Sequence, residues 1–354
     1  MVTNTITPIR IKERLVGPGH PCFIIAEAGV NHNGSLEMAL RLVDAAAEAG
    51  ADAVKFQTFK AEKVISPTAP KAAYQKQNLE RGESQLDMVR RLELSYDDFR
   101  SLEAHCRERD ILFLSTPCDD DSIDFLFDLG VPAYKIGSGD LTHHDHLRHI
   151  ARKGRPIILS TGMATFDEVD AALGILREAG VLEIALLHCV SSYPAPPEDC
   201  HLRAIGAMAE RFSVPVGWSD HTLGLHVALA AVVLGACILE KHLTLDRSLP
   251  GPDHPASLQL EELVGLVAQI RQVESALGTG QKALRLSEKD VARVARRSLH
   301  AVRDLPQGHR IQAGDITAMR PGTGISADRL GEVLGRTLLR TVPAGVMLTP
   351  EDLD

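Results

Sequence analysis

Short apolar segments alternate with helix-period segments over most of the chain. Eight apolar segments are predicted as β-strands, and most of them end in polar residues. Amphipathic segments lie between them, such as the one that begins at Ser35 and ends at Gly50. This order predicts a (β/α)8 TIM barrel, which is favoured over an open doubly wound sheet because a barrel gathers the strand ends in one mouth. The predicted strands span residues 22–30, 52–57, 111–117, 133–139, 156–162, 183–190, 214–220 and 237–245.

The pattern changes after the last predicted helix. A basic, polar segment is predicted as a linker or an exposed helix. Beyond it the chain contains no aromatic residue, and the pattern G-x-x-[IL]-x-x-x-D-[IL] occurs twice, from Gly308 and from Gly345. This repeat predicts a small β-rich domain with internal pseudo-symmetry. The expected organisation is an N-terminal extension (1–20), a barrel (21–281), a linker (282–296) and a C-terminal domain (297–354).

Composition excludes several classes of protein. Lys and Arg total 38 against 47 Asp and Glu, a net charge of -9, which argues against nucleic acid as a partner. The six cysteines are scattered without a C-x-x-C pair, so neither a disulfide framework nor a zinc knot is expected. The sequence contains no apolar run typical of a signal peptide or a membrane span, and we expect a cytoplasmic protein.

Two lysines occur inside apolar strand patterns, Lys55 in VKF and Lys135 in YKI. A solvated or ion-paired lysine is the common case, but a surface lysine is not expected in such a pattern. Together with the Ser and Thr residues at the strand ends, these lysines predict a site for a phosphate or a carboxylate. A separate interpretation is that one of them forms a Schiff base, as in lysine-dependent aldolases.

Two histidines, His221 and His242, end the seventh and eighth predicted strands, which are neighbours in a barrel. Their imidazoles could share one divalent ion and leave positions open for substrate oxygens. Hydrogen-bonded core histidines are the alternative. The run HTHHDHL, with His143, His144 and His146, is predicted mainly as a solvated loop.

Three more segments are candidates for function. The loop PGPDHPAS presents Asp253 to the predicted mouth, and the turn MRPGTG carries Arg320, whose guanidinium suits a carbonyl or a carboxylate. The long polar segment 73–95 is either a lid or an exposed insertion.

Many of these motifs, in this order, resemble the sialic acid synthase family. The resemblance runs from about residue 20 to the C-terminus, and the last fifty or so residues resemble the antifreeze-like (SAF, β-clip) domain of that family. It is carried by FIIAEAGVNHNGS, AVKFQT, FLSTP, AYKIGSGD, ILSTGM, LLHCVSSYP, GWSDHT, LEKHLTLDRSLPGPDHPAS and MRPGTG.

The resemblance implies condensation of phosphoenolpyruvate with an N-acetylated amino-hexose, giving a nine-carbon 2-keto-3-deoxy sugar acid and phosphate. The acceptor would be N-acetylmannosamine or 2,4-diacetamido-2,4,6-trideoxymannose. It also implies a divalent ion, Mn²⁺ first with Mg²⁺ or Co²⁺ as alternatives, and a domain-swapped homodimer.

The resemblance also assigns roles to individual residues. His221 and His242 would hold the metal, and Arg320 would reach the N-acetyl group in the partner subunit's site. Asp140 would be the base that activates water, although many relatives have Glu at this position. Phosphoenolpyruvate would be held by Lys55, Lys135, Ser138, Ser160 and Ser219, with Thr116 nearby. The sugar would be contacted or the reactants positioned by Glu27, Gln57, Asn78, Tyr193 and Asp253.

Two other classes of function remain open from the sequence. One is another barrel lyase, either a Schiff-base aldolase at Lys135 or a 3-deoxy-heptulosonate or octulosonate synthase. The other is a non-catalytic carbohydrate-binding protein.

Overall fold

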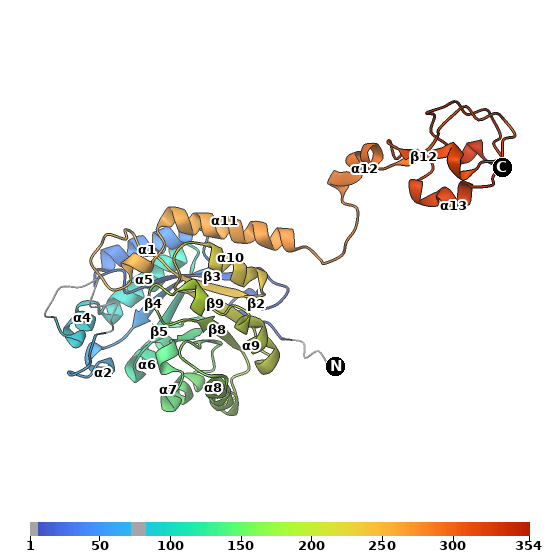
Figure 1. Cartoon of the computed structure of the whole chain (residues 1–354). Coiled ribbons are helices and arrows are strands. Elements are labelled where there is room, and N and C mark those ends of the chain that lie inside the picture. The colour runs from blue at the N-terminus through green and yellow to red at the C-terminus, as the bar shows by residue number, and fades with distance from the viewer. Residues whose placement is uncertain (1–5, 72–82) are drawn as a thin grey trace. The chain divides into compact units, whose positions relative to one another are not determined.

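The computed structural model describes residues 6–71 and 83–354. The chain forms two compact units, Met1–Gly278 and Thr279–Asp354 (Figure 1). Each unit has its own hydrophobic core.

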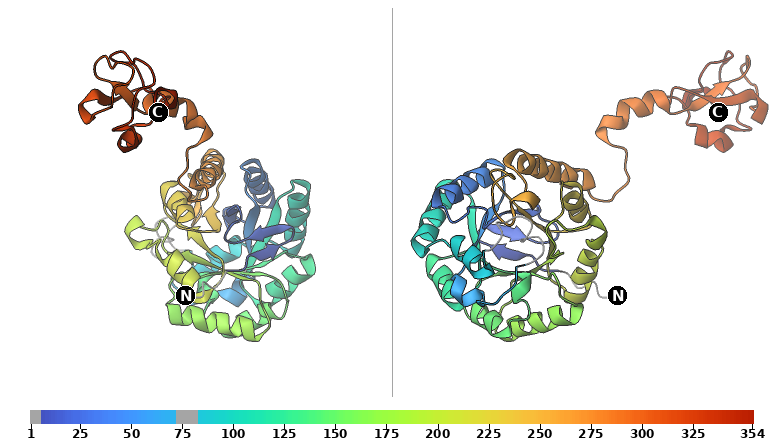
Figure 2. Two further views of the ribbon diagram at one scale, coloured as in Figure 1. Left: turned by 90° about the vertical axis from the view of Figure 1, so that its right-hand side faces the viewer. Right: turned by 60° about the vertical axis from the view of Figure 1, so that its left-hand side comes forward.

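The first unit is a ring of eight parallel strands, and the (β/α)8 prediction is confirmed (Figure 2). The hydrogen-bonded order is β5-β4-β3-β10-β9-β8-β7-β6, and the end strands β5 and β6 contact each other, so the barrel is nearly closed. The strands are β3 (Phe23–Gly29), β4 (Ala53–Thr58), β5 (Leu112–Pro117), β6 (Tyr134–Ile136), β7 (Ile157–Ser160), β8 (Ile184–Cys189), β9 (Val216–Asp220) and β10 (Ile238–His242).

Helices surround this ring and cover its outer face (Figure 2). Several begin where a Ser, Thr or Asp side chain caps the first turn, as Ser35, Ser95 and Thr165 do. The surrounding helices are α1 (Leu36–Glu48), α5 (Tyr96–Glu108), α6 (Asp120–Leu129), α7 (His144–Ala151), α8 (Phe166–Glu178), α9 (Ala204–Phe212), α10 (His226–Val233) and α11 (Leu260–Leu277), with the short α2 (Ala61–Val64) and α4 (Gln85–Arg91) between β4 and α5.

Strand side chains alternate between two buried environments. Those facing outward, such as Trp218 and Leu239, pack against the helices. Those facing inward form an apolar layer at the beginning of the strands, which includes Phe23 and Ile25. Further along the same strands the inward positions become polar, so the chemistry-bearing groups lie at the carboxyl ends.

A β-hairpin at the N-terminus packs against this inner apolar layer. It consists of β1 (Ile9–Ile11) and β2 (Arg14–Val16), and Ile9, Ile11 and Val16 are buried with the inner residues of the barrel. Figure 2 shows the hairpin across the axis of the ring. The sequence analysis did not predict it, because three-residue strands carry too little periodicity to recognise.

Two local predictions differ from the structure. The strand expected at 133–139 is only three residues long, because the Gly-rich segment after it turns into the 3-10 helix Ser138–Asp140. The histidine run is not a solvated loop throughout, since it enters helix α7. Within the run, His143 and His144 are exposed, whereas His146 is buried.

The second unit contains little regular secondary structure. Its elements are α12 (Lys289–Ala295), β11 (Ser298–Ala301), β12 (Ile316–Met319) and α13 (Leu330–Val333). The two copies of the repeated motif adopt matching 3-10 turns, Ala313–Asp315 and Pro350–Asp352, each closed by a capping box. The copies are joined where Leu305 and Val342, at corresponding positions, form an antiparallel bridge. The aliphatic core therefore lies between two related halves.

The turn at Asp315 is held by charge-assisted hydrogen bonds. The Asp315 carboxylate accepts from His309 Nε2 at 2.7 Å, from the Gln312 amide at 2.9 Å and from Arg303 Nη2 at 2.6 Å. The hydrogen bonds from His309 and Gln312, followed by that from Arg303, lower the pKa of Asp315 to about 2.

We predict that Asp315→Asn loosens the second unit without changing the barrel. Hydrogen exchange of amides in 298–319 should be at least about tenfold faster at pH 7, because three charge-assisted bonds are weakened. Since the folded-state pKa is depressed, this stabilisation is present above pH ~4 and is lost as the pH falls towards about 2. The difference between the variant and the wild type should therefore shrink in acid. Asp290→Asn, at an exposed position of α12, is the control, and equal exchange in both variants would contradict the prediction.

Candidate active site at the barrel mouth

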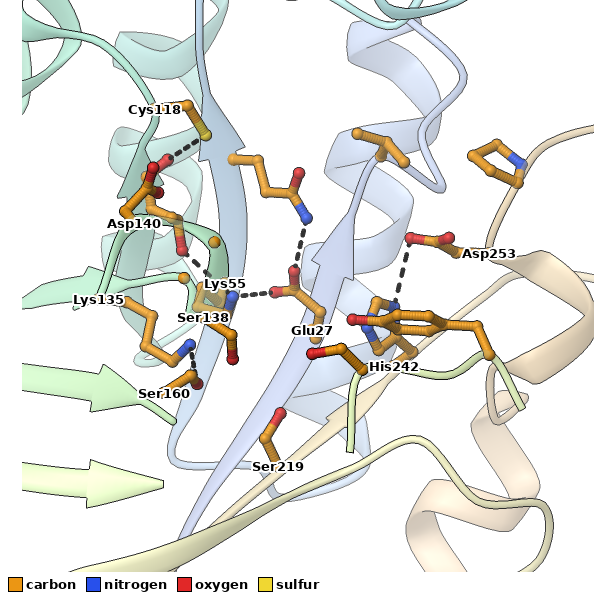
Figure 3. A pocket seen from close by; sticks show the side chains of 18 of the residues that line it. Glu27, Lys55, Cys118, Lys135, Ser138, Asp140, Ser160, Ser219, His242 and Asp253 are labelled. Atoms are coloured by element: carbon orange, nitrogen blue, oxygen red, sulfur yellow. Dashed lines mark hydrogen bonds and ion pairs between the residues drawn. The ribbon is translucent and has the colours of Figure 1, made fainter. Parts of the chain in front are cut away.

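A cavity of about 470 Å³ opens at the carboxyl ends of the barrel strands (Figure 3). Thirteen of the fifteen predicted site residues line it, although they come from strands far apart in the sequence. They are Glu27, Lys55, Gln57, Thr116, Lys135, Ser138, Asp140, Ser160, Tyr193, Ser219, His221, His242 and Asp253.

The other two predicted residues are not placed in this cavity. Asn78 lies outside the described residues. Arg320 belongs to the second unit, where it is exposed after β12 and its Nε donates to the Ala295 carbonyl at 3.0 Å.

Both predicted lysines are buried inside the mouth, and both are paired with carboxylates. Lys55 Nζ lies 3.0 Å from Glu27 Oε2 and 3.6 Å from Glu240 Oε2. Lys135 Nζ lies 3.4 Å from Glu240 Oε1 and donates to Ser160 Oγ at 2.8 Å. The side chains of both lysines and both carboxylates are at most 5% exposed. Two ammonium groups thus face two carboxylates, and all four side chains are buried.

The two carboxylates are tuned in opposite directions. Burial raises the pKa of Glu27 to about 7, and its ion pair with Lys55 only partly offsets this. Burial also works to raise the pKa of Glu240, but Lys135 and Lys55 outweigh it and lower the pKa to about 2. Glu240 is therefore the permanent counter-charge of the two lysines. No role for Glu240 follows from the sequence, where its one signal is its place near the end of the eighth barrel strand.

The two histidines stand face to edge on the opposite wall, with ring centroids 5.5 Å apart. His221 Nδ1 lies 2.7 Å from the Val190 carbonyl, which selects the tautomer with the proton on Nδ1 and leaves Nε2 as a lone pair. His242 Nδ1 is buried, has no hydrogen-bond partner among the described residues, and lies 3.8 Å from Asp253 Oδ2. Tyr193 packs against both rings.

This donor set fits a divalent ion that takes the rest of its ligands from elsewhere. Burial lowers the pKa of His221 and holds that of His242 well below its usual value, so both rings are neutral, the form that binds metals. Within 6–71 and 83–354, no three His, Cys, Asp or Glu side chains gather closely enough to hold an ion by themselves. Water or substrate oxygens would have to complete the coordination.

Two further carboxyl groups line the cavity. Burial raises the pKa of Asp140, although His146, His143 and Lys135 oppose the shift. Burial also raises the pKa of Asp253 to about 6. A raised pKa makes a carboxylate a stronger proton acceptor, as a general base requires.

Comparison with known proteins places the chain in a family. A model of the NeuB family matches residues 42–282, more than half of the chain, and a model of the SAF domain matches residues 296–354. The chain belongs to the NeuB family.

NeuB-family relatives match almost the whole chain. N,N'-diacetyllegionaminic acid synthase of Legionella pneumophila is 45% identical, covering 96% of both chains. The protein of the same name from Campylobacter jejuni is 47% identical over 88% of this chain and 94% of its own. The crystal structure of N-acetylneuraminic acid synthetase from Leptospira borgpetersenii superposes with a TM-score of 0.73 at 35% identity, covering 80% of this chain and 95% of that one.

No helix among the described residues of this NeuB-family chain is both long and apolar enough to cross a membrane.

We predict that Glu240→Gln destabilises the barrel strongly. The change leaves two buried ammonium groups with one carboxylate, so the free energy of unfolding should fall by about 3 kcal/mol. Urea unfolding followed by the fluorescence of Trp218, which is buried in the barrel and is the chain's one tryptophan, measures this change.

The control for that variant is Glu93→Gln, which removes the partly exposed Lys60–Glu93 pair and should cost less than about 1 kcal/mol. Inorganic phosphate should restore more stability to Glu240→Gln than it adds to the wild type, because it replaces the missing negative charge. Equal losses in the two variants would contradict the assignment of Glu240 as counter-charge.

Proposed function

We propose that this chain condenses phosphoenolpyruvate with an N-acetylated amino-hexose, releasing phosphate and a nine-carbon 2-keto-3-deoxy sugar acid. The observation that carries the proposal is the pair of buried lysines, with hydroxyl groups beside them, facing two neutral histidines across one cavity. One wall suits an anion with several negative charges, and the other suits polarisation of an aldehyde.

We propose 2,4-diacetamido-2,4,6-trideoxymannose as the first acceptor to test. The two relatives at 45% and 47% identity are both named for legionaminic acid, whereas the structure named for N-acetylneuraminic acid is 35% identical. N-acetylmannosamine is the second acceptor.

In this proposal the lysine wall holds phosphoenolpyruvate. Lys55 and Lys135 supply the positive charge, and Ser138, Ser160 and Ser219 supply hydrogen bonds to the phosphate and the carboxylate. Thr116 supports the site, since its hydroxyl accepts from Lys55 Nζ at 3.3 Å. Burial works to lower the pKa of both lysines. Glu240 and Glu27 outweigh it at Lys55, whose pKa is raised, whereas the pKa of Lys135 is lowered although Glu240 opposes the shift. Their carboxylate partners hold both side chains in place before the ligand binds.

Carbon–carbon bond formation places opposite charges at two positions. The C3 carbon of phosphoenolpyruvate attacks the aldehyde carbon, which leaves positive charge at C2 and an alkoxide at the former carbonyl oxygen. A divalent ion on His221 and His242, Mn²⁺ with Mg²⁺ or Co²⁺ as alternatives, would supply the Lewis acid that favours this alkoxide. Glu27, Gln57, Tyr193 and Asp253 orient the sugar, and Gln57 is itself held by Glu27 at 3.2 Å.

Water completes the reaction at C2. Asp140 takes one proton as the oxygen of water bonds to C2, and the resulting tetrahedral intermediate collapses with cleavage of the bond between C2 and the phosphate oxygen. The second proton of the water goes to the departing phosphate as the C2 hydroxyl becomes the ketone, and Asp140 returns its proton to the alkoxide. The products are the keto acid and hydrogen phosphate.

We predict phosphate release from phosphoenolpyruvate in the presence of Mn²⁺ and one acceptor, and its loss with EDTA. Lys135→Met should lower kcat/KM by at least about a hundredfold, because it removes a buried positive charge that faces the bound anion. Lys282→Met, at an exposed position in the second unit, is the matched control. A colorimetric phosphate assay with both acceptors and N-acetylmannosamine 6-phosphate measures these rates.

A Schiff-base lyase would give a different result in these assays. If no acceptor causes phosphate release and borohydride traps a keto acid on Lys135, the chain is a Schiff-base lyase and the proposal fails.

We propose further that the chain acts as a domain-swapped homodimer, in which Arg320 of the partner subunit contacts the N-acetyl group. Its guanidinium is exposed on the MRPGTG turn, which suits a contact with another molecule.

Mixing two inactive variants tests the swap. Lys135→Met and Arg320→Ala should each be nearly inactive. After unfolding and refolding together they should recover about a quarter of the wild-type activity, since half of the dimers would contain one site with both residues intact. If Arg320 acts within its own chain, no dimer contains an intact site and activity does not return.

A further inference from the structure

A buried ion pair lies directly behind the two candidate metal-binding histidines. Lys241 Nζ lies 2.8 Å from Asp220 Oδ2, and their side chains are 2% and 0% exposed. Asp220 precedes His221, Lys241 precedes His242, and the two residues are register partners across the neighbouring strands β9 and β10. Neither of them lines the mouth cavity.

The pair faces the opposite side of the sheet from the histidines. Side chains alternate along a strand, so Ser219 and His221 face the mouth while Asp220 faces the helices. The same alternation on β10 points Glu240 and His242 inward and Lys241 outward. Each candidate metal ligand therefore directly follows one member of the buried ion pair in the chain.

Additional hydrogen bonds join the Asp220–Lys241 pair to Thr222, the residue after His221. Lys241 Nζ donates to the Thr222 carbonyl at 2.7 Å. Asp220 Oδ1 accepts from the Thr222 amide at 2.9 Å and from the Thr222 hydroxyl at 2.8 Å. His221 is thus the middle residue of a turn that is held at both ends from the outer side, while its own ring is held by the Val190 carbonyl on the inner side.

The cost of this arrangement suggests a role beyond packing. Removing two charges from water costs several kcal/mol for each ion, and an apolar pair of similar volume would pack between barrel and helices at least as well. What an apolar pair could not do is clamp the backbone on both sides of His221 and tie it to the residue before His242.

We propose that Asp220 and Lys241 are positioning residues that set the spacing and orientation of His221 and His242 for one divalent ion. This inference rests on the metal-binding part of the proposed function. His221 is the first residue after β9 ends. Its carbonyl accepts from the Ala195 amide at 2.9 Å, which is not part of the β9–β10 ladder. Metal–nitrogen bonds require ligand atoms within a few tenths of an ångström of their ideal place, and the outer clamp provides this precision.

The test is Co²⁺ binding to the metal-free protein, read from its visible absorption. Lys241→Met alone would bury an unpaired carboxylate, so the decisive variant is Asp220→Asn with Lys241→Met, which removes both charges and retains an amide oxygen for Thr222. This double variant should unfold close to the wild-type temperature yet bind Co²⁺ at least tenfold more weakly, with an altered absorption band.

Two controls identify the cause. Arg271→Met disrupts the Arg271–Asp52 ion pair, which joins α11 to the beginning of β4 far from the mouth, and should leave Co²⁺ affinity unchanged. His221→Ala should abolish binding at the site.

Each alternative result has one meaning. Co²⁺ binding that depends on His221 but is the same in the double variant and the wild type would overturn the inference and leave the proposed function intact. Binding that is insensitive to His221→Ala would overturn both the inference and the metal-binding part of the proposed function.

Discussion

The closure of eight parallel strands into a ring is the constraint on which the rest of this molecule depends. Because every strand runs in the same direction, every inward-facing residue near a carboxyl end enters the same small space. Lys55 on β4, Lys135 on β6 and Glu240 on β10 are far apart in the chain, yet they lie within ion-pair distance. Helices cover the outside of the ring, and the β1–β2 hairpin covers its other end.

Burial strengthens the interaction between these charges and makes an unpaired charge costly. Two buried ammonium groups without partners would destabilise the fold, and the two carboxylates, Glu27 and Glu240, solve this problem within the mouth. The solution is uneven, since Glu240 contacts both lysines while Glu27 contacts one. Glu240 therefore stays ionised, whereas Glu27 is poised near neutrality.

The two faces of strands β9 and β10 carry side chains with different roles. On β9 and β10 the inner face carries Ser219 and Glu240 at the lysine wall, with His242 and, just past β9, His221 beyond them. The outer face carries the Asp220–Lys241 pair against the helices. Alternation along a strand thus lets consecutive residues contribute to binding and to support. In the second unit, two copies of one motif pack around a shared aliphatic core.

The sequence pattern predicts the barrel, its eight strands and thirteen of the residues that line the mouth. Period-2 and helix-period patterns are local, and a strand-end residue such as Lys55 or His242 is recognisable from its position alone. Only the tertiary structure decided how these groups pair. Glu240 became the shared counter-charge of two lysines because ring closure sets distances between strands that are separated by a hundred residues or more. His146, inside a polar run, was buried by the packing of α7, and the β1–β2 hairpin was ordered by the apolar end of the barrel. Burial, pairing and pKa are properties of neighbours in space, and a linear pattern does not contain them.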